Sequence, residues 1–248
     1  MPPLLHAVNL VKSFGGFRAV DGVELRVTAG TVHAVIGPNG AGKTTLFNLL
    51  AGYTKPTAGH VHFESYDITG LPPDTICRHG IVCAFQITQI FPRLTVTESV
   101  ECAVLARQRQ EWRWWSGLGG HARDEARELL EIVGLTSVAD QRSGALSHGD
   151  KRVLEVALAL ATGPRLLLLD EPTAGMSPVE TERTVALIRR LARERNLTVL
   201  LVEHDVRVVF SVSDRITVMH QGRILKEGPP DEVRESPEVI DVYLGAPV

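Results

Sequence analysis

Cysteine is scarce in this chain, with three among 248 residues. Cys77, Cys83 and Cys102 form no C-x-x-C pair and do not have the spacing of metal ligands. A disulfide framework and a zinc knuckle are therefore both excluded. We expect three buried, reduced thiols of a cytoplasmic protein.

Long hydrophobic runs are also missing. No apolar stretch approaches the roughly 18 residues that a membrane-spanning helix needs. Residues 1–14 lack the charged-then-apolar pattern of a signal peptide. We expect a chain that does not itself span a membrane, although it can dock on a protein that does.

An excess of one charge is absent, since the formal net charge is -3. No basic field attracts polyanions, so nucleic acid is not an expected partner. Aromatic residues make up only 5% of the chain, yet all three tryptophans lie in the run from Trp112 to Trp115. This run either contacts lipid headgroups or a membrane protein, or folds onto its own helical surroundings.

What the chain does contain is an alternation of strand and helix patterns. Residues 4–10 and 20–27 alternate apolar and polar side chains, as half-buried strands do. Residues 31–36 form a β-rich run that ends at a glycine-rich turn, and residues 44–51 predict a helix. Strand, turn and helix in this order are the context of a phosphate-binding loop.

The middle of the chain has a helical pattern instead. Between about residues 94 and 161, apolar residues at helical spacing predict helices that include residues 125–133 and 153–161. We expect residues 112–120, with their tryptophans and glycines, to form an exposed insertion within this helical region.

The strand and helix alternation then resumes. Four consecutive leucines within residues 165–170 predict a strand buried on both faces of a parallel sheet. An amphipathic helix is predicted over residues 184–193, a second buried strand over 198–202, and a hairpin over 215–226.

These patterns predict a single α/β domain over residues 1–248. Its nucleotide-binding core is expected from residues 1–86 and 162–248. The intervening residues 87–161 are expected to form an inserted helical subdomain.

The strongest motif matches G-x-x-x-x-G-K-[ST] without a gap. Its glycines let the backbone curl so that successive amides face the phosphates of a nucleotide. Lys43 can reach the β- and γ-phosphates, and the Thr44 hydroxyl can bind Mg²⁺. A chance match arises roughly once per hundred chains of this length, and its position between a strand and a helix makes chance a weaker explanation. The motif comprises Gly37, Pro38, Asn39, Gly40, Ala41, Gly42, Lys43 and Thr44.

A pair of carboxylates, Asp170 and Glu171, ends the leucine run. Asp170 can hold Mg²⁺ beside the phosphate-binding loop. Glu171 can orient or deprotonate the water that attacks the γ-phosphate. Taken alone, such a pair is more often the start of a solvated loop, but the preceding phosphate-binding loop favours the catalytic interpretation.

The run Leu146-Ser147-His148-Gly149-Asp150 resembles the ABC signature, whose usual form is L-S-G-G-Q. With Gln86, Asp170-Glu171 and His204 in the expected order, the chain resembles the nucleotide-binding subunit of an ABC transporter. The resemblance extends from Phe14 to Gly245. It implies a P-loop NTPase fold with a RecA-like core, an antiparallel β subdomain and an inserted α-helical subdomain.

The resemblance assigns roles to further residues. Phe14 corresponds to the aromatic residue that stacks on adenine, and Thr45 to a residue that binds phosphate beside Thr44. Gln86 corresponds to the glutamine that contacts Mg²⁺ and the attacking water and that senses the transmembrane partner. His204 corresponds to the switch histidine at the γ-phosphate, although alone it is more often a structural histidine.

The resemblance also implies a dimer with two ATP molecules between its subunits. The signature of one subunit would close over the ATP on the other, with donors from the Ser147 hydroxyl and the amides of His148 and Gly149. Three positions depart from the usual pattern. His148 replaces glycine, Asp150 replaces glutamine, and Ser177 stands where aspartate is usual, which puts the crosstalk between the two ATP sites in question.

The signature region and the ending Val242-Tyr243-Leu244-Gly245 resemble the branched-chain amino-acid importer branch, in its LivG-like form. The resemblance implies a peripheral subunit on the cytoplasmic face of the membrane. Its expected partners are two transmembrane permeases, a second ATPase (LivF-like or another copy) and, indirectly, a solute-binding protein. A urea or short-amide importer, and a soluble non-transport ABC ATPase, are the alternatives; a P-loop kinase or GTPase would not need the signature.

Overall fold

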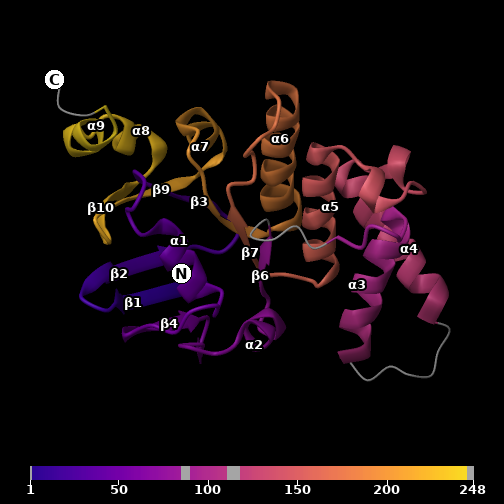
Figure 1. Ribbon diagram of the computed structural model, residues 1–248, viewed down its shortest axis with the longest axis horizontal. Coiled ribbons are helices and arrows are strands. Elements are labelled where there is room, and N and C mark those ends of the chain that lie inside the picture. The colour runs from indigo at the N-terminus through magenta and orange to yellow at the C-terminus, as the bar shows by residue number, and fades with distance from the viewer. Residues whose placement is uncertain (1, 85–89, 111–117, 245–248) are drawn as a thin grey trace.

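The computed structural model describes residues 2–84, 90–110 and 118–244 (Figure 1). Its larger sheet has the strand order β10-β9-β3-β8-β7-β6. The neighbours from β9 to β6 pair in parallel, and β10 pairs antiparallel with β9. The strands of this sheet are β3 (Val32–Ile36), β6 (Ile81–Ala84), β7 (Leu166–Asp170), β8 (Thr198–Val202), β9 (Arg215–His220) and β10 (Arg223–Gly228).

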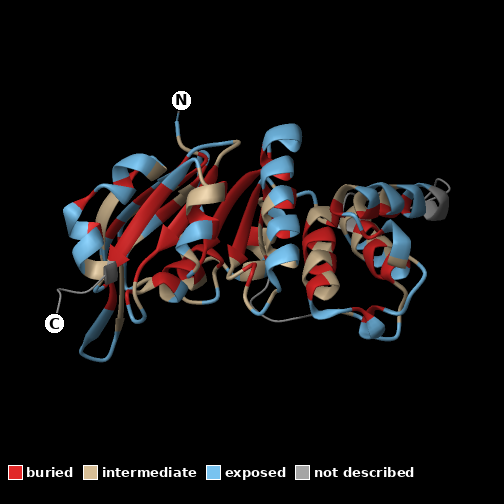
Figure 2. Cartoon of the chain, turned by 90° about the horizontal axis from the view of Figure 1, so that it is seen from above, coloured by how far each residue is buried: buried red, intermediate tan, exposed pale blue. Residues whose placement is uncertain are grey.

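The central strands of this sheet are almost entirely buried, as Figure 2 shows. Every residue of β3 and β8 is buried, which explains why their sequences do not alternate and are apolar apart from His33 and Thr198. The register pairs Asp170 at the end of β7 with Val202 at the end of β8. The loops that follow β3, β7 and β8 therefore leave the sheet at the same edge.

A second, antiparallel sheet has the order β2-β1-β4-β5. Its apolar face and helix α1 form one core cluster with the facing residues of the larger sheet, including Phe47, Phe63 and Leu168. The elements are β1 (Leu5–Phe14), β2 (Phe17–Val27), α1 (Lys43–Leu50), β4 (Ala58–Phe63) and β5 (Tyr66–Asp67). Helix α1 is thus held between the two sheets directly after the phosphate-binding loop.

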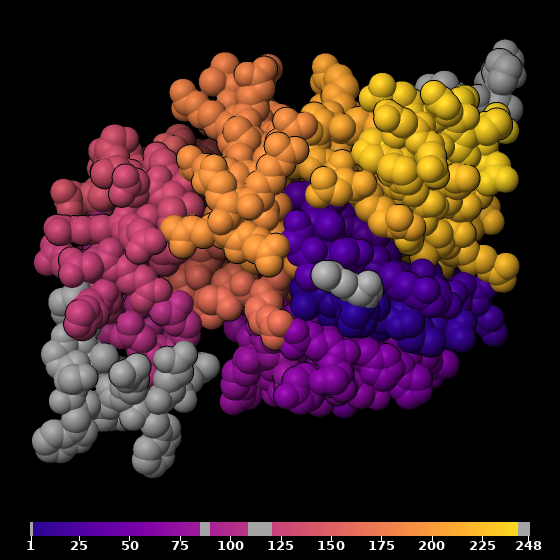
Figure 3. Space-filling view, turned by 180° about the vertical axis from the view of Figure 1, so that it is seen from behind, coloured from indigo at the N-terminus to yellow at the C-terminus, as the bar shows by residue number. Residues whose placement is uncertain are grey.

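Three helices, α3 (Val96–Gln110), α4 (Leu118–Val133) and α5 (His148–Ala161), pack on one another at one end of the molecule (Figures 1 and 3). Their apolar residues continue without a break into the core on the other face of the larger sheet. Arg107 of α3 donates two hydrogen bonds to the Glu125 carboxylate of α4, at 2.7 and 2.9 Å. Two short 3₁₀ turns, Thr136–Val138 and Ser143–Ala145, lead from α4 to α5.

The remaining helices lie between and after the strands of the larger sheet. None of the helices in the described ranges is long and apolar enough to cross a membrane. The remaining helices are α2 (Pro73–Arg78), α6 (Pro178–Arg195), α7 (Val206–Val212), α8 (Pro230–Arg234) and α9 (Pro237–Leu244).

The strands and helices predicted from the sequence are confirmed, and so is the α/β fold class. Two expectations are wrong in detail. Residues 118–120 begin helix α4 and so do not belong to an insertion outside the helices; the two glycines, which have low helix propensity, concealed this start in the sequence. Cys102 is exposed, while Cys77 and Cys83 are partly buried. The run Trp112–Trp115 lies outside the described residues.

Candidate functional site

The glycine-rich loop between β3 and α1 is held tightly by its neighbours. Gly42 adopts a left-handed conformation (φ 101°), and no side chain caps helix α1. A side chain at Gly42 would collide with the carbonyl oxygen of Ala19, and one at Gly37 with that of Met219. Because the first-turn amides of α1 have no side-chain acceptor among the described residues, they are available to an anion such as a phosphate.

Lys43 is oriented along this loop. Its Nζ donates to the carbonyl oxygens of Gly37 at 2.7 Å and Pro38 at 3.1 Å. Burial lowers the pKa of the Lys43 ammonium, and the nearby carboxylates of Glu171 and Asp170 act in the opposite direction. The ammonium is thus already close to the position from which it can neutralise phosphate charge.

Asp170 and Glu171 lie at the carboxyl end of β7, beside Lys43. Burial raises the pKa of the Asp170 carboxyl, and the neighbouring charge of Glu171 raises it further. Glu171 has a left-handed backbone (φ 51°) and its amide donates to the Val202 carbonyl at 2.9 Å. A non-glycine residue in this conformation costs about 1–2 kcal/mol, which the surrounding hydrogen bonds must offset.

His204 faces Glu171 from the loop after β8. Its Nε2 lies 2.7 Å from the Glu171 Oε1, and both side chains remain partly open to solvent. The structure therefore brings together Lys43, Asp170, Glu171 and His204, which the sequence places in three separate segments.

Glu203 is a residue that the sequence analysis missed. It is 4% exposed, and its Oε1 accepts from the Thr173 amide at 2.8 Å and from the Thr173 hydroxyl. Its Oε2 accepts from the His204 amide at 3.0 Å. The Glu203 carboxylate therefore connects the loop that carries Glu171 to the loop that carries His204. In the sequence, the only signal for this role was the position of Glu203 directly after a buried strand.

The signature residues begin helix α5. Ser147 is the N-cap, and its hydroxyl oxygen accepts from the Asp150 amide at 3.0 Å. The same hydroxyl donates to the Asp150 carboxylate at 2.8 Å. Ser147 and His148 are exposed and Gly149 is buried. Asp150 stands where the ABC signature usually has glutamine, and this difference changes the hydrogen bonding of Ser147. The Asp150 carboxylate accepts the hydrogen bond of the Ser147 hydroxyl, which the resemblance assigns to a phosphate.

The signature lies against the loop that contains Ser177, within the same chain. Ser177 and Glu180 form a reciprocal capping box that begins helix α6. A side chain at Gly149 would collide with the Glu180 carboxylate, and one at Gly175 would lie 3.7 Å from the His148 Nε2. Ser177 therefore keeps the capping role that an aspartate could fill at this position.

The structure describes three further candidate residues and leaves one outside the described ranges. Thr44 is exposed and Thr45 partly buried in the first turn of α1. Phe14 is 54% exposed at the hairpin between β1 and β2, where it pairs with Phe17, and the Lys12 ammonium lies 5.0 Å from its ring centroid. Gln86 lies outside the described residues.

An uncapped helix start with a buried lysine, beside two carboxylates and a histidine at one sheet edge, can bind a phosphate chain and activate water at its end. The fold and this site define an ATP-binding cassette of the P-loop class.

Comparisons with known proteins agree. Residues 20–174 match the family model described as ABC transporter. Residues 224–248 match the model described as branched-chain amino acid ATP-binding cassette transporter. The chain is 42% identical over 252 residues to the high-affinity branched-chain amino acid transport ATP-binding protein BraF of Pseudomonas aeruginosa, covering 98% of each chain. It is 40% identical to LivG of Escherichia coli K12, again over 98% of each.

Solved structures show the same fold. The ADP conformation of MJ1267, an ATP-binding cassette of an ABC transporter, superposes with a TM-score of 0.87 at 32% identity, covering 99% of this chain and all of that one. The cbiO1 protein of Clostridium perfringens superposes with a TM-score of 0.84 at 27% identity, covering 98% and 96%. The chain belongs to the ATP-binding proteins of ABC transporters, and within them to the branched-chain amino-acid (LivG/BraF) type. It is an ATPase whose hydrolysis of ATP drives transport.

Proposed function

We propose that this chain powers the import of branched-chain, hydrophobic amino acids through a membrane ABC transporter. The observation that carries the proposal is the match of residues 224–248 to the model of branched-chain amino-acid cassettes, combined with 42% identity to BraF across the chain. In this proposal the chain supplies the energy for transport and does not itself contact the solute.

In this proposal the P-loop residues Gly37–Thr44 cradle the phosphates of ATP, with Thr45 adding a hydroxyl. Lys43 exchanges its bonds to the Gly37 and Pro38 carbonyls for bonds to the β- and γ-phosphates. Phe14 stacks on the adenine ring; its ring is exposed and belongs to neither hydrophobic core cluster, which fits that role.

The residues that would hold Mg²⁺ are Thr44, Asp170 and Gln86. The raised pKa of Asp170 supports this assignment, because burial and the Glu171 charge leave a carboxylate that a divalent cation would stabilise. Such an ion, when bound, neutralises the charge that develops on the phosphates.

Hydrolysis is assigned to Glu171 and His204. The Glu171 carboxylate accepts a proton from the attacking water, and the adjacent His204 imidazole orients this carboxylate and contacts the γ-phosphate. Gln86 completes the set as the residue that contacts the water and senses the permease.

The complete site requires a second ATPase subunit, either LivF-like or another copy of this chain. Within this chain, Gly149 lies against Glu180 and His148 lies near Gly175, while Ser147 and His148 are exposed at the start of α5, where they can face a nucleotide on a partner. A dimeric structure of MJ0796 bound to ADP and Pi, 27% identical to this chain, supports such an arrangement. The assembly would sit on the cytoplasmic face of the membrane, against two permeases served by a solute-binding protein.

The test is uptake of labelled leucine and labelled urea by cells whose only copy is the Glu171→Gln form. We expect leucine uptake to be lost and urea uptake to persist. Cells with Glu182→Gln, an exposed carboxylate on α6, serve as the matched control and should import both. Loss of urea uptake alone would move the assignment to a urea or short-amide importer, and normal uptake of both solutes would refute the proposal.

A further inference from the structure

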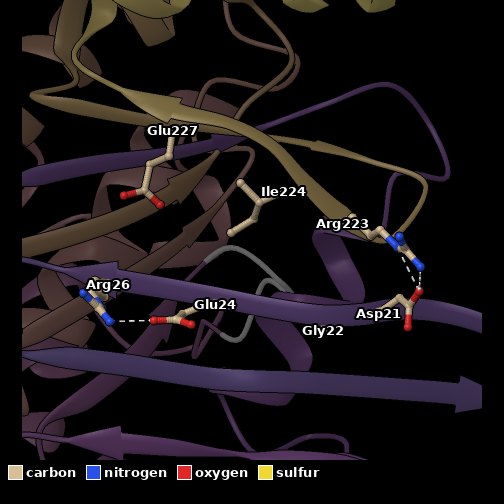
Figure 4. A pocket seen from close by; sticks show the side chains of 7 residues that line it. All are labelled: Asp21, Gly22, Glu24, Arg26, Arg223, Ile224 and Glu227. Carbon is tan, nitrogen blue, oxygen red and sulfur yellow. Dashed lines mark hydrogen bonds and ion pairs between the residues drawn. The ribbon is translucent and has the colours of Figure 1, made fainter.

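A groove of about 660 Å³ separates two edge strands that belong to different sheets (Figure 4). One wall is β2 of the antiparallel sheet, and the other is β10 of the larger sheet. The residues that line it include two ion pairs, one that crosses the groove and one that does not. Arg223 reaches across to Asp21, whereas Glu24 and Arg26 pair with each other along β2.

Asp21 receives hydrogen bonds from two arginines. Its Oδ2 accepts from the Nε of Arg223 at 2.9 Å and from the Nη2 at 2.6 Å, and its Oδ1 accepts from Arg18 at 2.8 Å. The hydrogen bonds from Arg18 and Arg223 hold the pKa of this carboxyl below its usual value. The Asp21 side chain is 16% exposed, although both arginines are largely open to solvent.

The backbone of Asp21 continues this link to the phosphate-binding loop. Its amide donates to the Gly222 carbonyl at 2.8 Å, and the Gly222 amide donates to the Ala41 carbonyl at 3.0 Å. Ala41 lies inside the P-loop. Two residues before Asp21, the Ala19 carbonyl approaches Gly42 so closely that a side chain there would collide with it. The segment Ala19–Asp21 therefore contacts both the P-loop and the hairpin turn at Gly222.

The same strand carries the aromatic hairpin. Phe17, which pairs with Phe14, begins β2 only four residues before Asp21. The position of the hairpin relative to the P-loop is thus set where Asp21 joins β2, β10 and the loop. This junction therefore connects two surfaces. One is the hairpin with Phe14, where the proposed function places adenine, and the other is the P-loop, where it places the phosphates.

We propose that Asp21, clasped by Arg223, is a positioning residue that aligns the Phe14 ring with the P-loop so that one nucleotide engages both. The inference rests on the proposed function, which places adenine on Phe14. Asp21 touches neither the base nor the phosphates. Its effect is confined to ligands that span both surfaces.

The test compares two ligands of the whole protein, ATP and inorganic tripolyphosphate, each with Mg²⁺. Tripolyphosphate has the phosphate chain but no base. Affinities would be measured by calorimetry for the wild type and for Asp21→Asn, Arg223→Gln, Phe14→Ala and the control Glu24→Gln. The control removes a charge from the other ion pair in the same groove. Thermal melting of each variant identifies any that fails to fold. Because the Arg223 side chain is more exposed than that of Asp21, Arg223→Gln should disturb folding less than Asp21→Asn.

We expect Phe14→Ala to weaken ATP by about tenfold through lost stacking. Asp21→Asn and Arg223→Gln should weaken ATP roughly two- to fivefold, the size of a partly exposed ion pair. A double variant that combines Asp21→Asn with Arg223→Gln should lose little more ATP affinity than either single variant, because both changes remove the same ion pair. Tripolyphosphate affinity should stay unchanged in all of them, and Glu24→Gln should bind both ligands normally.

The outcomes separate the two proposals. If Phe14→Ala weakens ATP selectively but Asp21→Asn and Arg223→Gln do not, the positioning role is refuted while the adenine assignment stands. Equal weakening of both ligands by a folded Asp21→Asn variant also refutes it, since that result indicates a disturbed P-loop. If Phe14→Ala has no selective effect, the adenine assignment itself fails.

Discussion

At the scale of single residues, Glu171 combines a left-handed backbone with a 2.7 Å contact to His204. We expect Glu171→Gln to bind ATP normally but to lower turnover by about 10²–10⁴-fold, because the amide cannot accept the proton of the attacking water. A phosphate-release assay beside nucleotide binding measures both quantities. Glu182→Gln should keep normal turnover. Full turnover in Glu171→Gln would contradict the assignment of Glu171 as the general base.

His33 is a second residue with a measurable signature, this time in stability. It is fully buried in β3, where its Nε2 lies 2.8 Å from the Thr217 hydroxyl. Burial lowers the pKa of His33 from 6.5 to about 3. Between these two values the unfolded chain binds a proton that the folded protein does not, so this contribution to stability is complete above about pH 6.5 and is lost as the pH falls.

The corresponding variant is His33→Gln, compared with His121→Gln, a histidine exposed on α4. One proton taken up on unfolding changes the free energy of unfolding by about 1.4 kcal/mol per pH unit. Urea unfolding between pH 7.5 and 5 should show a smaller loss of stability in His33→Gln than in the wild type or in His121→Gln. Equal slopes in all three proteins would contradict the buried, neutral state of His33.

At the scale of elements, helix α6 is coupled to helix α5 through one carboxylate. Glu180 closes the capping box with Ser177 and also fills the space beside Gly149. Ser177→Ala should cost about 1 kcal/mol of folding free energy through the lost cap. Gly149→Ala should displace Glu180 and so break the same cap from the other side.

Because both changes act on the same interaction, we expect the double variant to be less destabilised than the sum of the two single variants. Urea unfolding of the four proteins gives the coupling energy. Gly16→Ala is the control, since nothing lies within 4 Å of a side chain at Gly16. Strictly additive losses would show that Glu180 does not connect the two helix starts.

The elements that the sequence predicted are those with a strong local pattern. The leucine run of β7 and the apolar run of β8 are short and buried on both faces, as the strands of a parallel sheet are. The missed elements are short or irregular. Strand β4 contains Gly59 in a left-handed conformation, and α2 has only six residues with a proline in its first turn. Their conformations depend on tertiary contacts that no local period records.

The residues of the candidate site also divide into those that the sequence predicted and those that it missed. Lys43, Asp170 and Glu171 were predictable because each follows a strand of one parallel sheet, whose ends meet at one edge. Glu203 was not, because a glutamate after a strand is ordinarily solvated, and its partner Thr173 lies on a different loop. The contact between Gly149 and Glu180 is equally invisible to local patterns.

At the scale of the whole molecule, the proposed function divides the site into two halves, each of which would face a partner subunit. The P-loop half includes Lys43 and Glu171, and the signature half includes Ser147 at the exposed start of α5. ATP bound between two subunits would be covered by one half-site from each, and slow hydrolysis should keep the subunits together.

We therefore expect the Glu171→Gln protein to associate in the presence of ATP, with itself or with a LivF-like ATPase. Size-exclusion chromatography with light scattering would follow this association. Ser147→Arg, which places bulk at the start of α5, should abolish it, whereas Ser65→Arg, at an exposed turn between β4 and β5, should not. Absence of ATP-dependent association in both mixtures would contradict the shared site.

The position of β3 in its sheet also has a consequence for synthesis on the ribosome. This strand leads into the P-loop, yet its two neighbours come late in the chain, since Val32 pairs with Val199 and His33 with Arg215. At about 5–20 residues per second, roughly ten to forty seconds separate translation of β3 from that of its partners. During this interval the nascent chain carries the complete nucleotide-binding motif without the sheet that shapes it. Nucleotide is therefore expected to stabilise the nascent protein only near the end of its translation, once β8 and β9 can pair with β3.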